Sequence, residues 1–434
     1  MKRALDLGKV STRLQRIGKL AGEDPNRVLT SLAYCIDEHL LWEALMATRK
    51  NGAPGVDKVT WGEYHANWRE NLADLKERFK SGQYKAPSLR RSYIPKADGS
   101  KRPIAITTLE DKVLQRAVAM VLSSVYEQDF YDFSYGFRPK KSAHQAVHTL
   151  QNCLWETNGG WALEVDIKGF FDAISHRHLR AILDQRVKDG VIRRTIDKWL
   201  KAGILEKGTV TYPTTGSPQG GVISPLLANI YLHEVLDKWF VEMVLPELKG
   251  WVRMVRYADD FVMIFQREED AKRVAAVIPK RFAKYELEIH PKKTRLVDFR
   301  FPIGKSGKKP GTFNFLGFTF HWIKSRKGKW YPTRKTDRKK FGKGLDSIRE
   351  WCKKNRHLPL GKQQETLNRK LMGHYAYFGI RGNHLSIKNF HYQVTLIWKK
   401  WLGRRDQRKR LSWKRFSKIL ARLSLVPPRI VHSQ

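Results

Sequence analysis

The chain has 434 residues, 41% of them hydrophobic and 11% aromatic, which excludes a disordered protein and allows two or three folded domains. Its 83 Lys and Arg against 42 Asp and Glu give a formal net charge of +41, an excess that would repel itself unless a polyanion such as nucleic acid neutralised it. Three widely spaced cysteines and the lack of an apolar run near ~18 residues exclude a disulfide framework and a membrane span, so we expect a cytoplasmic protein.

Strands and helices alternate irregularly along the sequence, which predicts an α+β fold rather than a doubly wound sheet. The first expected element is a helix over residues 28–47. Residues 88–106 alternate in polarity around an Asp-Gly pair and predict a β-hairpin. The pattern Thr107-x-x-Glu110 then predicts a capping box at the start of the next helix.

The middle of the chain carries acidic residues on expected strands. Residues 161–171 form a strand whose apolar side chains share one face, so Asp166 points the opposite way near the carboxyl end. Residues 251–265 contain two β-prone runs that flank the adjacent pair Asp259-Asp260. The sequence therefore predicts that carboxylates gather where strands end.

The remaining expected elements lead to a basic C-terminal region. A glycine-rich loop precedes a helix with Ser224 as its N-cap and Pro225 in its first turn. Residues 313–322 predict one further strand. Residues 321–434 contain 31 Lys and Arg against five acidic residues, so positive charge is concentrated in this last quarter of the chain.

Adjacent carboxylates at a strand junction repel one another, and a bound cation would relieve that repulsion. Carboxylate oxygens are natural ligands of Mg²⁺. With Asp166 as a third ligand, Asp259 and Asp260 can hold two Mg²⁺ ions (Mn²⁺ is an expected substitute) roughly 3.5–4 Å apart for in-line phosphoryl transfer. The alternative interpretation of Asp259-Asp260 alone is a polar hairpin turn, because Asp favours turns.

Segments spread along the chain resemble, in order, the motif blocks of group II intron reverse transcriptases, which also act as maturases. The resemblance covers roughly residues 50–380. The matching segments are NGAPGVD (51–57), YIPKADGSKRPIAI (93–106), QDFYDFSYGFRPKKSAHQAV (128–147), EVDIKGFFDAI (164–174), GSPQGGVISPLLANIYLHEVLD (216–237), RYADDF (256–261), HPKKTR (290–295), FLGF (315–318) and MGHYAYFGI (372–380). The acidic pair alone is weak support, whereas the ordered set excludes a chance match.

The resemblance implies a right-hand polymerase with fingers, a palm built on an antiparallel sheet, and a helical thumb. We expect an N-terminal extension and fingers over residues 1–150 and the palm over residues 151–325. The thumb and maturase domain X would occupy residues 326–400, followed by a basic DNA-binding extension over residues 401–434. The alternative for this last segment is a solvated basic helix.

The resemblance also implies roles for single residues. Those expected to bind metal are Asp166, Ile167, Asp259 and Asp260, and the three aspartates among them are the expected catalytic residues. Those expected around the incoming dNTP are Lys96, Arg102, Phe170, Phe171, Gln219 and Lys293. Those expected along nucleic acid are Pro218, Gly220, Arg138, Tyr257, Arg334, Lys335, Arg404 and Arg405.

Alternatives stay open for several of these residues. Phe171 is a better candidate than Phe170 for the aromatic residue that excludes a ribose 2′-hydroxyl and so separates DNA synthesis from RNA synthesis. For Lys96 and Arg102 the alternative is a surface charge on the hairpin. Lys292 is as basic as Lys293 and competes with it for the place near the pyrophosphate.

The implied function is RNA-directed DNA synthesis with Mg²⁺, which adds dNTPs to a DNA primer 3′-hydroxyl on an RNA template. A second implied role is that of a maturase, which binds intron RNA in a ribonucleoprotein and assists splicing and mobility. The resemblance is to compact bacterial proteins of the class C type, so we expect a protein without the His/Asn/Cys-rich endonuclease domain of many relatives. Two alternatives remain: a domesticated reverse transcriptase in host defence or repair, and an RNA-binding splicing cofactor with vestigial polymerase activity.

Overall fold

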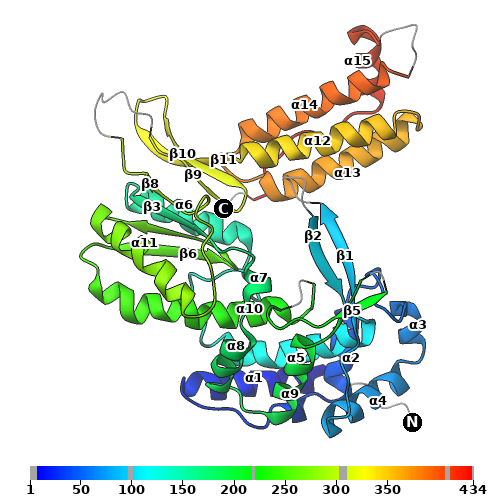
Figure 1. Ribbon diagram of the computed structural model, residues 1–434. Helices are drawn as coiled ribbons and strands as arrows, with labels where there is room; N and C mark the ends of the chain where they lie inside the picture. Colours follow the sequence, from blue (N-terminus) through cyan, green and yellow to red (C-terminus); the bar gives the residue numbers. More distant parts are fainter. Residues whose placement is uncertain are drawn as a thin grey trace.

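The computed structural model describes residues 7–95, 101–206, 208–217, 220–302, 310–405 and 411–432. Within these ranges, helices alternate irregularly with three small sheets, so the predicted α+β class is confirmed (Figure 1). No helix in the described part of the chain combines the length and the apolarity that a membrane span requires.

The N-terminal region is a group of helices packed around α5. They are α1 (Leu7–Glu23), a 3-10 turn (Ala33–Cys35), α2 (Glu38–Met46), α3 (Trp61–Ala66), α4 (Trp68–Ser81) and α5 (Leu109–Tyr126). The helix expected over residues 28–47 is wrong in its first ten residues. The Asp37 carboxylate accepts a hydrogen bond from the Leu40 amide at 3.0 Å and thereby starts α2 at Glu38.

The predicted hairpin is present as β1 (Leu89–Pro95) paired with β2 (Lys101–Ile106). Its tip lies outside the described residues. β4 (Ile204–Glu206) runs parallel to β1, and β5 (Thr209–Thr211) completes a sheet of order β2-β1-β4-β5. Helix α5 follows one residue later than predicted, because Thr108 rather than Thr107 caps it through the Asp111 amide at 3.3 Å.

The central sheet is antiparallel throughout, with order β6-β7-β3-β8. Its strands are β3 (Trp161–Asp166), β6 (Val252–Tyr257), β7 (Asp260–Phe265) and β8 (Arg295–Asp298). α6 (Ala143–Glu156) and α11 (Glu268–Ala283) supply buried residues to opposite faces. On β7, Phe261 and Met263 pack in the core that contains α11, whereas Val262 packs in the core that contains α6. Because side chains alternate along a strand, Asp166 and Asp260 lie at the end of the α6 face.

Shorter helices connect the hairpin region to the central sheet. They are α7 (Phe170–Ala173), α8 (His176–Asp184), α9 (Gly190–Leu200) and α10 (Ser224–Leu232). After α10, the chain continues in two π-helical turns (His233–Lys238 and Phe240–Val244) and a 3-10 turn (Leu245–Glu247). α10 begins at Ser224, so its N-cap is Ile223 and not Ser224 as predicted.

The segment expected to form one strand over residues 313–322 is two strands. β9 (Phe313–Phe315) and β10 (Phe318–Lys324) pair around a two-residue turn, and β11 (Trp330–Thr336) completes the sheet β11-β10-β9. Both turn residues have left-handed φ, 49° at Leu316 and 80° at Gly317. This is the type I′ geometry that joins two antiparallel strands directly.

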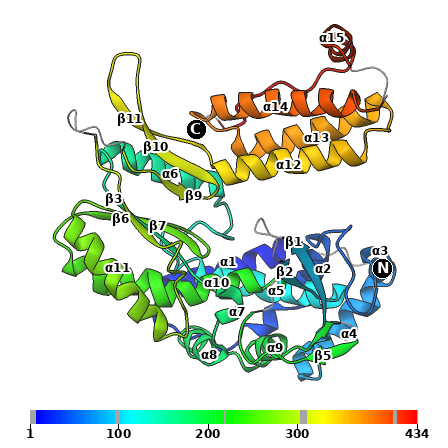
Figure 2. The same cartoon turned by 45° about the horizontal axis from the view of Figure 1, so that its top comes forward.

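The C-terminal helices form a separate layer. α12 (Arg338–Lys354), α13 (Leu360–Phe378) and α14 (His384–Leu402) lie side by side in both views and join the rest of the protein next to the β9–β11 sheet (Figures 1 and 2). α15 (Trp413–Arg422) inserts the fully buried Phe416 into the same core as these helices.

The predicted domain boundaries at residues 150, 325 and 400 remain predictions. The boundary at residue 150 lies within α6, the one at residue 325 lies in the β10–β11 hairpin, and the one at residue 400 lies within α14. In addition, one hydrophobic core joins the N-terminal helices to the central sheet. Helix α6, the β10–β11 hairpin and helix α14 therefore continue across the predicted boundaries.

Candidate active site

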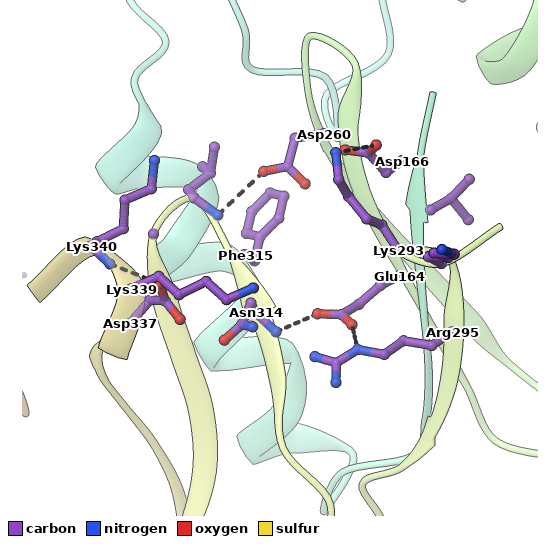
Figure 3. Close-up of a pocket in the computed structure, with 14 residues that line it drawn as sticks. Glu164, Asp166, Asp260, Lys293, Arg295, Asn314, Phe315, Asp337, Lys339 and Lys340 are labelled. Carbon is purple, nitrogen blue, oxygen red and sulfur yellow. Dashed lines mark hydrogen bonds and ion pairs between the residues drawn. The ribbon is translucent and has the colours of Figure 1, made fainter. Parts of the chain in front are cut away.

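The strand register brings the predicted acidic residues together. Asp166 on β3 is paired directly with Asp260 on β7, and Asp260 is paired on its other side with Tyr257 on β6. Ala258 and Asp259 form the two-residue turn between β6 and β7, with a left-handed φ of 55° at Ala258. Asp166 and Asp260 point into one pocket (Figure 3). Asp259 lies on the turn directly before Asp260, so the three aspartates lie at one end of the sheet.

A close backbone contact fixes the position of this turn. A Cβ atom at Gly136 would lie 2.3 Å from the Ala258 nitrogen, so only glycine fits there. The Asn229 side-chain amide donates a hydrogen bond to the Gly136 carbonyl at 2.5 Å. The Tyr135 amide donates to the Arg256 carbonyl at 2.8 Å. The segment before Gly136 therefore extends the sheet beside β6 and supports the acidic turn.

A buried ion pair lies behind the turn. The side chains of Arg256 and Asp237 are both 0% exposed. The Arg256 guanidinium donates from Nε to Asp237 Oδ1 at 2.8 Å, and from Nη1 to Asn229 Oδ1 and the Ala258 carbonyl, each at 3.1 Å. One cation thus connects the first π-helical turn, α10 and the acidic turn. No motif in the sequence predicts this pairing.

The first pocket, of about 390 Å³, lies between the acidic residues, the β9–β10 turn and the start of α12. Its lining includes five cations: Lys292, Lys293, Arg295, Lys339 and Lys340. The Leu316 amide donates to Asp260 Oδ2 at 3.4 Å (Figure 3). The Tyr377 hydroxyl of α13 donates to the Leu316 carbonyl at 2.8 Å. The strained turn residue is therefore held between α13 and an acidic residue.

The neighbouring acidic residues affect the ionisation of Asp260. The pKa of Asp260 is raised to about 7, chiefly because neighbouring protein removes its carboxyl from water and also because of the charges of Asp259 and Asp166, while the Leu316 amide opposes the rise. Asp260 still has an exposed side toward the pocket. Lys293 Nζ lies 3.0 Å from Asp166 Oδ2 and offsets part of the negative charge.

This arrangement bears on metal binding. In the described ranges, no three or more His, Cys, Asp or Glu side chains are grouped so that they could hold a metal ion. The donors at the strand ends are nonetheless all carboxylate oxygens, which suit Mg²⁺. Removal from water and the charges of Asp259 and Asp166 disfavour the ionised form of Asp260 and raise its pKa, and a bound cation would favour that form. A divalent cation fits this chemistry.

A second pocket, of about 620 Å³, lies on the other side of Asp166. The predicted residues in its lining are Asp166, Ile167, Phe170, Phe171, Gly220, Asp259 and Lys293, and Pro103 and Ile104 of β2 lie opposite. Phe170 is 2% exposed and packs in the core, whereas Phe171 is only half-buried. Phe171 is therefore the aromatic ring that is more accessible from the pocket.

The loop before α10 approaches β2 closely. Gly220 has a φ of 116°, and a Cβ atom there would lie 2.4 Å from the Ala105 carbonyl oxygen. The Gln115 side chain of α5, which no sequence pattern indicated, accepts hydrogen bonds from the amides of Val222 at 2.8 Å and Ile223 at 3.3 Å. These contacts hold one wall of the second pocket.

Some predicted residues cannot be placed. Lys96, Pro218 and Gln219 lie outside the described residues. Of Arg102, only the backbone is described, and it pairs with Ile94 in the hairpin. The expected contacts of Lys96, Gln219 and Arg102 with the nucleotide, and of Pro218 with nucleic acid, remain predictions.

Arg138 was expected along nucleic acid, yet the structure buries it. Its guanidinium donates to the carbonyls of Tyr131 at 2.7 Å and Ser134 at 2.8 Å and to the Glu127 carboxylate at 3.0 Å. These bonds hold the segment that leads to Gly136, so the position of Arg138 favours a structural role. Tyr257 is half-buried at the end of β6, beside the acidic turn.

The other cations expected along nucleic acid line neither pocket. Arg334 of β11 is 6% exposed, and burial lowers its pKa to about 10, whereas the neighbouring Lys335 is exposed. After α14, the exposed Arg404 lies 5.0 Å from the centre of the Trp401 ring. Arg405 donates to two carbonyls of the α12–α13 connection. Lys335, Arg404 and Arg405 are thus the exposed members of this group, although two donors of Arg405 are already used by these carbonyls.

Comparison with known proteins agrees with the geometry. Residues 94–320 match the family described as reverse transcriptase (RNA-dependent DNA polymerase). The chain is 34% identical over 287 residues to protein YkfC of Escherichia coli strain K12, which covers 59% of this chain and 75% of YkfC.

Two other relatives are intron proteins. The chain is 37% identical over 233 residues to the group II intron-encoded protein LtrA of Lactococcus lactis, which covers 53% of this chain and 38% of LtrA. It is 39% identical over 202 residues to an uncharacterized 91 kDa protein in the cob intron of Schizosaccharomyces pombe, which covers 44% of this chain and 24% of that protein. The chain thus spans less than half the length of these two intron proteins.

Proposed function

Because this chain belongs to the reverse transcriptase (RNA-dependent DNA polymerase) family, we propose that it copies RNA into DNA by adding dNTPs to a primer 3′-hydroxyl at Asp166, Asp259 and Asp260. The family implies that the protein binds nucleic acid and nucleotides and uses divalent metal ions. The observation that carries the proposal is the register that pairs Asp166 with Asp260 between the two pockets.

The residues around the two pockets are assigned separate roles in this reaction. Two bound Mg²⁺ ions, held by Asp166, Asp259 and Asp260, would activate the primer 3′-hydroxyl and neutralise the leaving pyrophosphate. The second pocket receives the dNTP, with Phe171 against the sugar and Gly220 allowing close backbone approach. Lys293, already beside Asp166, and the predicted Lys96, Arg102 and Gln219 attract the triphosphate.

The subdomains of a right-hand polymerase follow from the same proposal. The central sheet is the palm, the β1–β2 hairpin with α1–α5 forms the fingers, and α12–α14 form the thumb. In this proposal, the exposed cations Lys335 and Arg404 contact the backbone of a template–primer duplex, which is recognised by its A-form shape rather than by its base edges.

The direct test of the proposal uses the purified protein, an RNA template with an annealed DNA primer, dNTPs and Mg²⁺. We expect primer extension that stops when EDTA removes the metal ions. A lack of dNTP incorporation with either Mg²⁺ or Mn²⁺ would overturn the enzyme assignment and favour an RNA-binding cofactor.

A second role, as a maturase, is supported by two observations. The similarity to LtrA makes this a reverse transcriptase of the group II intron type, and the net charge of +41 exceeds what a nucleotide site alone needs. We propose that the protein also binds its intron RNA as a ribonucleoprotein and assists splicing. The test is the DNA that flanks the gene. A group II ribozyme in this DNA would support the maturase role, whereas its absence would favour a domesticated enzyme.

Phe171 should determine the choice of sugar. We expect Phe171→Ala to raise the ratio of rNTP to dNTP incorporation by roughly 10- to 100-fold, because a shape contact of this size is worth ~1–3 kcal/mol. Steady-state extension with each nucleotide measures the ratio. Phe301→Ala, which removes a Phe that lines neither pocket, is the matched control and should leave the ratio unchanged. If both variants give the wild-type ratio, Phe171 is not the residue that excludes the 2′-hydroxyl.

Tyr377 should act through the β9–β10 turn. Tyr377→Phe removes the hydrogen bond to the Leu316 carbonyl but keeps the ring stacked on Phe318. We expect kcat for primer extension to fall about fivefold, the equivalent of a hydrogen bond of ~1 kcal/mol, with a changed Mg²⁺ dependence. Tyr375→Phe is the control, because its hydroxyl on the same helix donates to the Val426 carbonyl instead. Equal losses in the two variants would mean that only thumb stability is affected.

A further inference from the structure

A chain of hydrogen bonds lies behind the loop that forms one wall of the second pocket. Gly221 of this loop lines the pocket. The next two amides, those of Val222 and Ile223, donate to the side-chain oxygen of Gln115 on α5. Gln115 in turn donates from Nε2 to Asp111 Oδ2, one helical turn earlier, at 3.1 Å. The wall of the pocket is therefore bonded, through one side-chain amide, to a carboxylate in the first turn of α5.

The other oxygen of Asp111 is held from the opposite side. Asp111 Oδ1 accepts hydrogen bonds from the Tyr84 hydroxyl and from Trp199 Nε1 of α9, the latter at 2.6 Å. The side chains of Tyr84, Asp111, Gln115 and Trp199 are at most 3% exposed. The adjoining space of about 10 Å³ has room for no more than about one water molecule. Bulk water therefore cannot replace a bond that one of these groups loses.

The carboxylate sets the direction of the bonds in this chain. Burial raises the pKa of Asp111 to about 6, and three hydrogen bonds to its oxygens oppose the rise, so the group is ionised above neutral pH. An ionised carboxylate only accepts hydrogen bonds. Gln115 must therefore turn its NH2 group toward Asp111, which leaves its oxygen toward the two loop amides.

We propose that Asp111 is a positioning residue for the incoming nucleotide, because it fixes the orientation of the Gln115 amide that holds the loop of the second pocket. The inference rests on the proposed function, in which this pocket receives the dNTP. If the Gln115 amide were reversed, its NH2 group would face two N–H groups, and the buried amide of Ile223 would lose its acceptor. The loop would then move away from α5, and Gly221 would no longer hold its place beside the nucleotide.

The test replaces the carboxylate by its amide. In Asp111→Asn, the side-chain oxygen can still accept from Tyr84 and Trp199. The new NH2 group then faces Gln115 and reverses that amide. Single-turnover extension of a DNA primer on RNA at varied dNTP concentrations separates the Kd for the nucleotide from the maximal rate. We expect this Kd to rise about tenfold, as for one lost hydrogen bond to a buried donor, with the maximal rate within about twofold of the wild type.

A double variant restores the bond directions. In Asp111→Asn with Gln115→Glu, the Asn NH2 group donates to one Glu oxygen and the two loop amides donate to the other, with no change in net charge. We expect the nucleotide Kd to return to within about threefold of the wild type. A Kd that stays as high as that of Asp111→Asn would overturn the proposal. Where Asp111→Asn does not fold, Gln115→Met removes the acceptor of the loop amides at similar volume, and a wild-type Kd in this variant would also overturn it.

Tyr84→Phe is the matched control. It removes one donor to Asp111 but reverses no bond, so it should lower the unfolding temperature and leave the nucleotide Kd within about twofold of the wild type. A rise in Kd equal to that of Asp111→Asn would mean that only stability is affected, and the positioning role would be wrong. It would also be wrong if Asp111→Asn kept the wild-type Kd while the wild type extends primers. A wild type that extends no primer would instead overturn the proposed function.

Discussion

Replacing Asp259 by Asn is expected to lower the rate of primer extension by on the order of 10³-fold, since the loss of one metal-binding carboxylate removes several kcal/mol of transition-state stabilisation. Asn keeps the size of the side chain and its place on the turn, so the fold and the affinity for RNA should stay within about twofold of the wild type. Single-turnover extension of a DNA primer on RNA measures the rate, and titration with fluorescent RNA measures the affinity.

The same variant separates the two proposed roles. If the protein assists splicing by clamping RNA, Asp259→Asn should leave that assistance largely intact. Asp132→Asn is the matched control, because it removes an exposed carboxylate that pairs only with Lys141 among the ion pairs of the described residues. An equal loss of splicing and synthesis in Asp259→Asn would show that the roles are not separable, and an equal loss in Asp132→Asn would point to a general charge effect.

Local patterns in the sequence predicted the elements that carry the site. The β1–β2 hairpin and the β6–β7 pair follow from alternation around short turns. The alternation in residues 161–166 also places Asp166 on the face where it pairs with Asp260. The hairpins and the strand face of Asp166 depend only on residues that are neighbours in the chain, so they can be predicted from a single sequence.

Boundaries and short strands were harder to predict, because several residues compete for the same local role. Thr107 and Thr108 are both good N-caps, and only the folded chain shows that Thr108 is used. The turn at Leu316 interrupts the segment expected as one strand, since a leucine with left-handed φ has no sequence signature. β4 and β5 have three residues each, too few for a periodic pattern.

The supports of the site were missed because they join distant parts of the chain. Arg256 and Asp237 are 19 residues apart, Tyr377 and Leu316 are 61 apart, and Gln115 and Val222 are 107 apart. The same limit explains Arg138. Its motif suggests a cation available to nucleic acid, whereas its donors are used by carbonyls and a carboxylate that only the fold brings to it.

Breaking the buried ion pair should have the largest effect on stability. Asp237→Leu leaves the Arg256 guanidinium enclosed without its carboxylate partner, and the expected cost is ~3–5 kcal/mol of the free energy of unfolding. Urea or thermal unfolding measures the loss. Glu234→Ala, which breaks the more exposed pair with Lys238 on the same segment, is the control and should cost less than ~1 kcal/mol.

The double variant Asp237→Leu with Arg256→Met distinguishes stability from positioning. Replacing both charges by apolar side chains removes the unpaired cation, so much of the lost stability should return. Primer extension should not return with it, because Arg256 also donates to the Ala258 carbonyl and to Asn229, and those bonds hold the turn that carries Asp259. Recovery of both properties would reduce Arg256 to a structural residue. Recovery of stability with a persistently low kcat would show that the buried cation holds the acidic turn in place for nucleotide addition.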